Sequence, residues 1–354
     1  MTHSSAGQIR IGSTLIGPGN PVWIVAEAGV NHNGDPELAQ SLVREAKRAG
    51  ADCVKFQTFA ASRVASAGAA KAPYQLLSTD AGESQLEMLR RLELDEAALD
   101  ALVGLCREED IEFLSTPYSV DDVELLESLG VRAYKIASAL IVEPSLLRRI
   151  GETHKPVLLS TGLATLAEVE ESVTVLRDAG SNDLVVLQCT TDYPARPDEA
   201  NLRAMQTMAS ALGVLPGYSD HTETDTTAIA AVALGAVVVE KHLTLDRSLP
   251  GPDQATSATP EEFAALVHAI REAESALGSG TKEPGPSELR NLETMRRSVV
   301  ALRTIEAGAT LEADMLTTKR PAGGIPPRDL ERVVGRSAKV TIGADQPLEW
   351  WMVE

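Results

Sequence analysis

Eight short apolar runs recur along the chain and alternate with stretches of helical periodicity. The runs span residues 22–26, 53–57, 111–115, 133–137, 157–160, 184–188, 215–219 and 237–241. Between them, residues 36–49 and 165–179 each repeat apolar side chains on one helical face before a glycine. A (β/α)8 barrel buries every parallel strand on both faces, so this alternation predicts an α/β fold of the TIM-barrel type.

The two ends of the chain add smaller elements to this barrel. Residues 9–12 and 14–17 are short β runs that predict an N-terminal hairpin against the barrel floor. Residues 278–286 are too rich in glycine and proline for helix or strand, which predicts a linker. We therefore assign residues 1–277 to the barrel, 278–297 to the linker and 298–354 to a small β-rich domain that is marginally stable alone.

Composition and charge narrow the class of protein. The 354 residues include 32 Lys and Arg against 51 Asp and Glu, a formal net charge of -19. This excess of acid argues against nucleic acid or a membrane as a partner. No membrane-length apolar stretch or export signal is visible, and Cys53, Cys106 and Cys189 are too scattered to predict disulfides. We expect a soluble cytoplasmic protein.

Polar residues gather at the carboxyl ends of the predicted strands, where barrel enzymes place their chemistry. Lys55, Lys135 and Lys241 lie at the ends of the second, fourth and eighth strands. Hydroxyl-bearing residues at such ends are Thr116, Ser138, Ser160 and Ser219. Cations combined with O–H donors hold a phosphate or a carboxylate, so the strand ends predict an anion pocket with three lysines.

Two histidines mark a candidate metal site. His221 and His242 directly follow the neighbouring seventh and eighth strands, which places both imidazoles at one rim. Two imidazoles suit an open metal site, although imidazole alone does not choose among Zn, Mn, Fe and Co. The alternative is a pair of hydrogen-bonded structural histidines. After strand eight, Asp253 ends a stiff turn that either aims its carboxylate at the rim or is only a turn.

Seven short motifs lie at or beside these strand ends. They are AEAGVNHNG (26–34), VKFQT (54–58), STPY (115–118), YKIAS (134–138), LSTG (159–162), YSDHT (218–222) and EKH (240–242). With them the chain resembles the N-acetylneuraminate (sialic acid) synthase family, and TKRPAGG (318–324) is similar to its antifreeze-like (SAF) domain. The resemblance implies a transferase that condenses phosphoenolpyruvate with N-acetylmannosamine to give N-acetylneuraminate, a nonulosonic acid, and phosphate. The alternative is a legionaminic or pseudaminic acid synthase that takes a diacetamido-trideoxyhexose.

The resemblance also implies roles for individual residues. Phosphoenolpyruvate would be held by Lys55, Thr116, Lys135, Ser138, Ser160 and Ser219. His221 and His242 would bind a divalent metal that polarises the sugar aldehyde, usually Mn²⁺ in this family, with Mg²⁺ and Co²⁺ as alternatives. The sugar would meet Gln57, Tyr193 and Asp253, and also Arg320 from the partner subunit of a domain-swapped homodimer.

Three positions depart from the family pattern. Leu140 stands where the family usually has a carboxylate, Gln188 replaces a common His and Thr191 replaces a common Asn. Because leucine cannot transfer protons, Glu27 and Asp253 become the candidates for acid–base chemistry, and we count Glu27 with the two rim histidines as catalytic. A Schiff-base aldolase that uses a strand-end lysine, or a non-catalytic sugar-binding homologue, stays open as an alternative.

We expect Glu27→Gln to lower turnover with little loss of fold stability, because glutamine keeps the size of the side chain but cannot exchange the proton. Steady-state phosphate release and the unfolding midpoint measure the two effects. Unchanged turnover would remove Glu27 from the mechanism.

Overall fold

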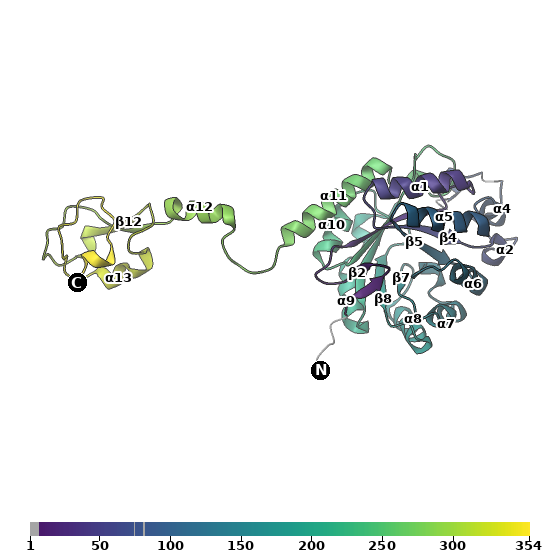
Figure 1. Cartoon of the computed structure of the whole chain (residues 1–354), viewed down its shortest axis with the longest axis horizontal. Helices are drawn as coiled ribbons and strands as arrows, with labels where there is room; N and C mark the ends of the chain where they lie inside the picture. Colours follow the sequence, from purple (N-terminus) through teal and green to yellow (C-terminus); the bar gives the residue numbers. More distant parts are fainter. Residues whose placement is uncertain (1–6, 74, 81) are drawn as a thin grey trace. The chain divides into compact units, whose positions relative to one another are not determined.

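Eight parallel strands form the centre of the computed structural model, which describes residues 7–354 except 74 and 81. They are β3 (Trp23–Gly29), β4 (Cys53–Thr58), β5 (Glu112–Pro117), β6 (Tyr134–Ile136), β7 (Val157–Ser160), β8 (Leu184–Cys189), β9 (Leu215–Asp220) and β10 (Val238–His242). Their hydrogen-bonded order is β5-β4-β3-β10-β9-β8-β7-β6, and β5 lies beside β6. The sheet therefore curls into a nearly closed barrel, which confirms the predicted strands and fold (Figure 1).

Helices connect the strands and surround the barrel (Figure 1). They are α1 (Pro36–Arg48), α2 (Ala61–Val64), α3 (Gln75–Ser78), α4 (Gln85–Arg90), α5 (Glu96–Glu108), α6 (Val120–Ser128), α7 (Pro144–Gly151), α8 (Leu166–Ala179), α9 (Arg203–Leu212), α10 (Thr226–Ala233) and α11 (Pro260–Leu277). Several begin at a side chain that accepts hydrogen bonds from free backbone N–H groups, as Asp35 does before α1 and Thr165 before α8. The helices predicted over residues 36–49 and 165–179 are thus confirmed to within one residue at each end.

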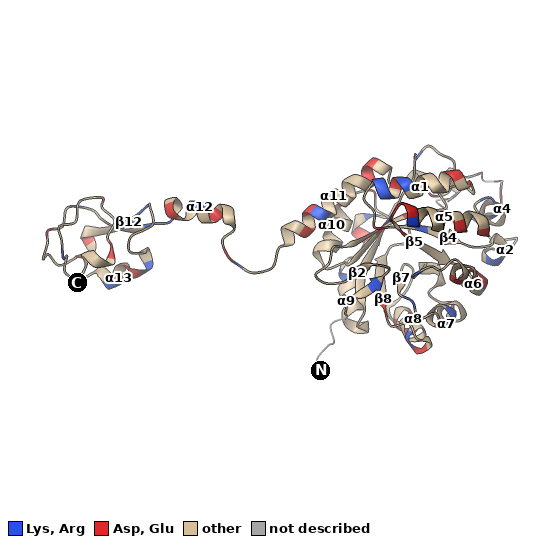
Figure 2. Cartoon of the chain, viewed as in Figure 1, with Lys and Arg blue, Asp and Glu red and all other residues tan. Residues whose placement is uncertain are grey.

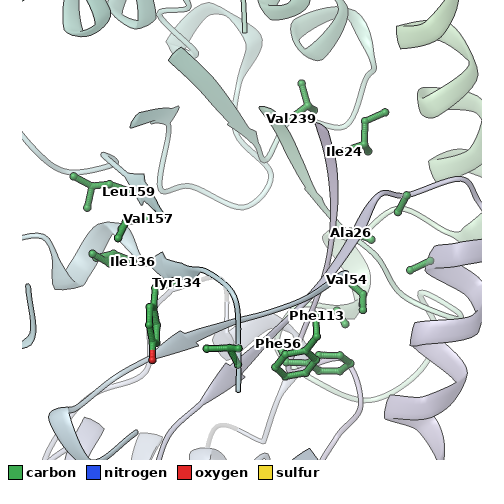
Figure 3. Close-up of a cluster of buried hydrophobic side chains, with 14 of the residues drawn as sticks. Ile24, Ala26, Val54, Phe56, Phe113, Tyr134, Ile136, Val157, Leu159 and Val239 are labelled. Atoms are coloured by element: carbon green, nitrogen blue, oxygen red, sulfur yellow. The ribbon is translucent and has the colours of Figure 1, made fainter. Parts of the chain in front are cut away.

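The main core lies between the strands and the helices. Strand side chains such as Ala26, Val54 and Phe56 alternate with residues that face the barrel interior, and they pack against apolar faces of the helices (Figure 3). The rings of Phe56 and Phe113 stack with their centroids 5.8 Å apart. This continuous and mainly apolar layer packs the helices against the strands.

The predicted N-terminal hairpin is present and closes the amino end of the barrel. β1 (Ile9–Ile11) and β2 (Thr14–Ile16) pair antiparallel. Ile9, Ile11 and Ile16 are buried in one cluster with Trp23 and Leu215, the first residues of β3 and β9. Because these side chains fill the interior at the amino ends, ligands have room at the carboxyl ends.

The chain divides into two compact units between Gly278 and Ser279. Residues 278–285 form neither helix nor strand, but α12 (Pro286–Met295) occupies the second part of the predicted linker. The C-terminal unit has its own core, with β11 (Ser298–Ala301) paired to β12 (Leu316–Lys319) and a short helix, α13 (Leu330–Val333). The rest of this β-rich unit is joined by isolated bridges, one of which links Ala338 to Val353.

Lys, Arg, Asp and Glu residues are spread along the helices on the outside of the barrel (Figure 2). Among the described residues, no helix is both long and apolar enough to span a lipid bilayer.

Ile16→Ala should lower the free energy of unfolding of the barrel by about 2–4 kcal/mol, because it leaves a cavity in the closed floor. Leu15→Ala is the matched control, since its half-buried side chain points to the other face of the same strand. Urea unfolding followed by circular dichroism measures both variants, and equal losses would contradict a packed floor.

Candidate active site

A cavity of about 380 Å³ lies at the carboxyl ends of the barrel strands. Every strand from β3 to β10 contributes a side chain, in order Glu27, Lys55, Thr116, Lys135, Ser160, Cys189, Ser219 and Glu240. The cavity is also lined by Gln57, Ser138, Tyr193, His221, His242 and Asp253. Of the predicted site residues, the cavity lacks only Lys241 and Arg320; Arg320 follows β12 in the C-terminal unit.

Four charged side chains pair at the bottom of this cavity. The Lys55 Nζ lies 2.5 Å from Glu27 Oε2 and 3.7 Å from Glu240 Oε1. The Lys135 Nζ lies 3.3 Å from the same Glu240 oxygen, which also accepts a hydrogen bond of 3.1 Å from Ser219 Oγ. None of the four charged side chains is more than 4% exposed. The two lysines and two glutamates thus form a balanced buried cluster.

The two glutamates of this cluster differ in pKa. Burial raises the pKa of Glu27 above its usual value, and the neighbouring Lys55 opposes this only in part. Burial acts on Glu240 in the same direction, but Lys135 and Lys55 outweigh it and lower the pKa of Glu240. Glu240 is therefore the ionised carboxylate that holds both lysines, and Glu27 is the carboxyl better suited to exchange a proton.

Apart from Glu27 Oε2, which the ion pair with Lys55 satisfies, three buried polar atoms of the cavity have no hydrogen-bond partner within the described part of the chain. They are Ser160 Oγ, Glu240 Oε2 and His242 Nδ1. Buried polar atoms in folded proteins are nearly always hydrogen-bonded. Three such atoms around one cavity indicate a site built for a polar ligand.

The two rim histidines lie side by side, with ring centroids 5.5 Å apart. The Nδ1 of His221 lies 2.7 Å from the Thr190 carbonyl oxygen and donates a hydrogen bond to it. In the neutral ring the lone pair is then on Nε2. Burial lowers the pKa of His242 well below its usual value, so its ring is the neutral form that binds metals. The described residues contain no cluster of three or more metal-ligating side chains. A divalent ion held by these two imidazoles would need substrate or water as its other ligands.

The predicted sugar residues surround this pair. The Tyr193 ring lies 4.2 Å from that of His221, and Asp253 Oδ2 lies 4.0 Å from His242 Nδ1. Burial and the charge of Glu27 raise the pKa of Asp253 to about 6. Gln57 donates to Glu27 Oε1 at 3.2 Å. Asp253 thus has the pKa expected of an acid–base group near neutral pH.

Lys241 does not line the cavity, so the prediction of three lysines in the pocket is wrong for this residue. Successive side chains on a strand point to opposite faces, and Glu240 and His242 point inward. Lys241 therefore points outward, where its Nζ lies 2.8 Å from Asp220 Oδ2 and donates to the Thr222 carbonyl at 2.7 Å. It joins two strands behind the site.

Sequence reasoning assigned no role to Glu240 or Cys189. The signal for Glu240 was its position two residues before His242, which puts both on one strand face. Cys189 lines the cavity with its Sγ 3.9 Å from His221 Nδ1. Leu140, where the family usually has a carboxylate, packs against the core outside the cavity, and Gln188 donates to the Ala200 carbonyl.

Comparison with known proteins identifies the family. Residues 42–282 match the NeuB family, and residues 296–354 match the SAF domain. The chain belongs to the NeuB family. The predicted resemblance, the SAF domain and the prediction of an enzyme are thereby confirmed.

Two relatives of this NeuB-family protein are N,N'-diacetyllegionaminic acid synthases. The one from Campylobacter jejuni is 44% identical over 325 residues, which cover 91% of this chain and 97% of the relative. The one from Legionella pneumophila is 41% identical over 336 residues, which cover 94% of each chain. The crystal structure of N-acetylneuraminic acid (sialic acid) synthetase from Leptospira borgpetersenii superposes with a TM-score of 0.73 at 33% identity. That match covers 82% of this chain and 97% of the other.

Lys241→Met should lower the free energy of unfolding by about 3–5 kcal/mol, because it leaves the Asp220 carboxylate buried without its cation. The double variant Asp220→Asn/Lys241→Met should recover part of the loss, since the uncompensated charge is gone. Urea unfolding of the two variants tests this, and a single variant as stable as the unmodified protein would show that the pair is not structural.

Proposed function

We propose that this protein condenses phosphoenolpyruvate with the open-chain form of an N-acylated amino sugar, and that this sugar is a diacetamido-trideoxyhexose. The observation that carries the proposal is the cavity with two buried lysines, three unpartnered polar atoms and two neighbouring imidazoles. The choice of sugar rests on the two legionaminic acid synthases at 44% and 41% identity. They favour the alternative over N-acetylmannosamine, the sugar that the sequence analysis placed first.

Phosphoenolpyruvate would bind at the charged bottom of the cavity. Lys55 and Lys135 supply the cations, and Ser160 Oγ supplies a donor that has no partner among the described residues. An anion adds negative charge to a cluster that already holds two carboxylates. That added charge raises the already elevated pKa of Glu27 further, which makes its carboxylate a stronger base for the step that follows. Thr116, Ser138 and Ser219 would complete the set of hydroxyl donors.

His221 and His242 would hold the divalent metal, with Mn²⁺ as the ion usual in the family. The two rings are neighbours, and burial keeps the ring of His242 neutral. Burial disfavours the charged form of His221 as well, but the nearby Cys189 outweighs it and raises the pKa of His221, so this ring would give up any proton it carries when the metal binds. Substrate or water would fill the other positions. A bound divalent ion supplies a Lewis acid that polarises the sugar aldehyde.

The chain's own carboxyls would move the protons of the reaction. C3 of phosphoenolpyruvate forms a bond to the aldehyde carbon, and the aldehyde oxygen takes a proton from Asp253, whose pKa of about 6 suits an acid. Water then adds to C2 and gives its proton to Glu27. The C2 hydroxyl then passes its proton to the leaving phosphate as the bond between C2 and the phosphate oxygen breaks and the C2 ketone forms, while Lys55 and Lys135 stabilise the departing negative charge. Loss of the proton from Glu27 and uptake of one by Asp253 restore the starting state.

The sugar would be oriented by residues from two subunits. Gln57 and Tyr193 line the same cavity as the acid–base groups and would contact the sugar there. Arg320 lies in the C-terminal unit and would reach the N-acyl group from the partner subunit of a domain-swapped homodimer.

A substrate panel with mass spectrometry of the product tests the proposal. With phosphoenolpyruvate and the diacetamido-trideoxyhexose we expect a nine-carbon acid and one phosphate for each product molecule, and we expect EDTA to stop both. N-acetylmannosamine serves as the comparison sugar.

Two other outcomes would contradict this proposal. Borohydride trapping of a covalent pyruvate adduct, with indifference to EDTA, would identify a Schiff-base aldolase. The absence of phosphate release with every sugar would identify a non-catalytic sugar-binding protein.

A further inference from the structure

The outer part of the cavity has an apolar wall. We use this name for Val30, Phe59, Val64, Met88, Leu89 and Leu92, which line the cavity and pack together with Tyr118 as one cluster. They come from the segment after β3 and from the segment between β4 and α5, which includes α2 and α4. These segments follow the strand ends, so the wall lies outside the charged cluster.

The apolar wall adjoins the proposed sugar side of the cavity. Phe59 stands two residues after Gln57, and its ring meets that of Tyr118 edge-on with centroids 5.6 Å apart. The Tyr118 hydroxyl donates to Gln57 Oε1 at 3.1 Å. The wall is thus joined to the sugar site by direct contacts, whereas Lys55 and Lys135 lie deeper, within β4 and β6.

On the basis of the proposed function, we propose that the apolar wall receives the C4 to C6 end of the sugar and selects methyl groups there. The aldehyde C1 must meet phosphoenolpyruvate beside the lysines, so the far end of the open-chain sugar extends into the outer part of the cavity. A diacetamido-trideoxyhexose carries a methyl group at C6 and an acetamido group at C4. N-acetylmannosamine carries hydroxyl groups at both positions.

The physical basis is the difference between burying a methyl group and burying a hydroxyl group. A methyl group against the wall leaves water favourably, whereas a hydroxyl group there loses hydrogen bonds to water without replacement. Gln85, half-buried at the edge of the same lining, offers an amide to the C4 acetamido group. Each methyl-sized difference in an apolar pocket changes kcat/KM by roughly 10- to 200-fold.

Two nearly isosteric variants test the wall. Val64→Thr and Leu89→Asn each place a polar group in it, and both side chains are only partly buried, so the fold tolerates the change. The test compares kcat/KM for the diacetamido-trideoxyhexose with kcat/KM for N-acetylmannosamine. In each variant the ratio of the first to the second should fall at least tenfold. The matched controls Val142→Thr and Leu277→Asn, at exposed positions outside this cavity, should keep the original ratio.

A second measurement needs no variant. The unmodified protein should use 6-deoxy-N-acetylmannosamine at least tenfold better than N-acetylmannosamine in kcat/KM. Equal use of these two sugars, or an unchanged ratio in the folded wall variants, would overturn the role of the apolar wall. Failure of the proposed function looks different, because then no sugar releases phosphate from phosphoenolpyruvate.

Discussion

The pairing of two buried lysines with two buried glutamates is the interaction on which the site depends. Each charge taken out of water costs several kcal/mol unless a partner compensates for it. Glu240 compensates for two, because one of its oxygens faces both Lys55 and Lys135 while Ser219 supplies a further hydrogen bond. A chain with a net charge of -19 can thus keep two cations inside its barrel without anions from solvent.

The alternation of side chains along β9 and β10 divides the same strand ends into two layers. Glu240 stands opposite Ser219 in the parallel register, and Lys241 stands opposite Asp220. The first pair faces the cavity and the second faces away from it. The outer ion pair joins the two strands that carry His221 and His242, so it fixes the spacing between the imidazoles from behind. The register between β9 and β10 therefore sets both the structural ion pair outside the barrel and the ligand site inside it.

The sequence was sufficient for the fold because barrel strands are continuous apolar runs, and these runs need no knowledge of distant contacts. The candidate site residues could be predicted as well, because they stand at the carboxyl ends of these apolar runs. The direction of the Lys241 side chain could also have been predicted from the sequence. Successive side chains of a strand point to opposite faces, so Lys241 points away from the face that carries Glu240 and His242. The apolar wall was not predictable in this way. Its residues lie in connecting segments and on short helices such as α2 (Ala61–Val64), whose packing depends on contacts between separate segments.

The cavity has a charged end and an apolar end, and this gradient orients the two proposed substrates. A carboxylate and a phosphate cannot rest against Met88 and Leu92 without losing their hydration. A deoxygenated sugar beside the lysines would offer neither cation a negative charge. Each proposed substrate therefore favours one end of the cavity. Their reacting carbons would meet where the charged end adjoins the apolar end, beside Glu27 and Gln57. On this view the apolar wall contributes to the reaction as well as to the choice of sugar, because it directs the aldehyde toward phosphoenolpyruvate.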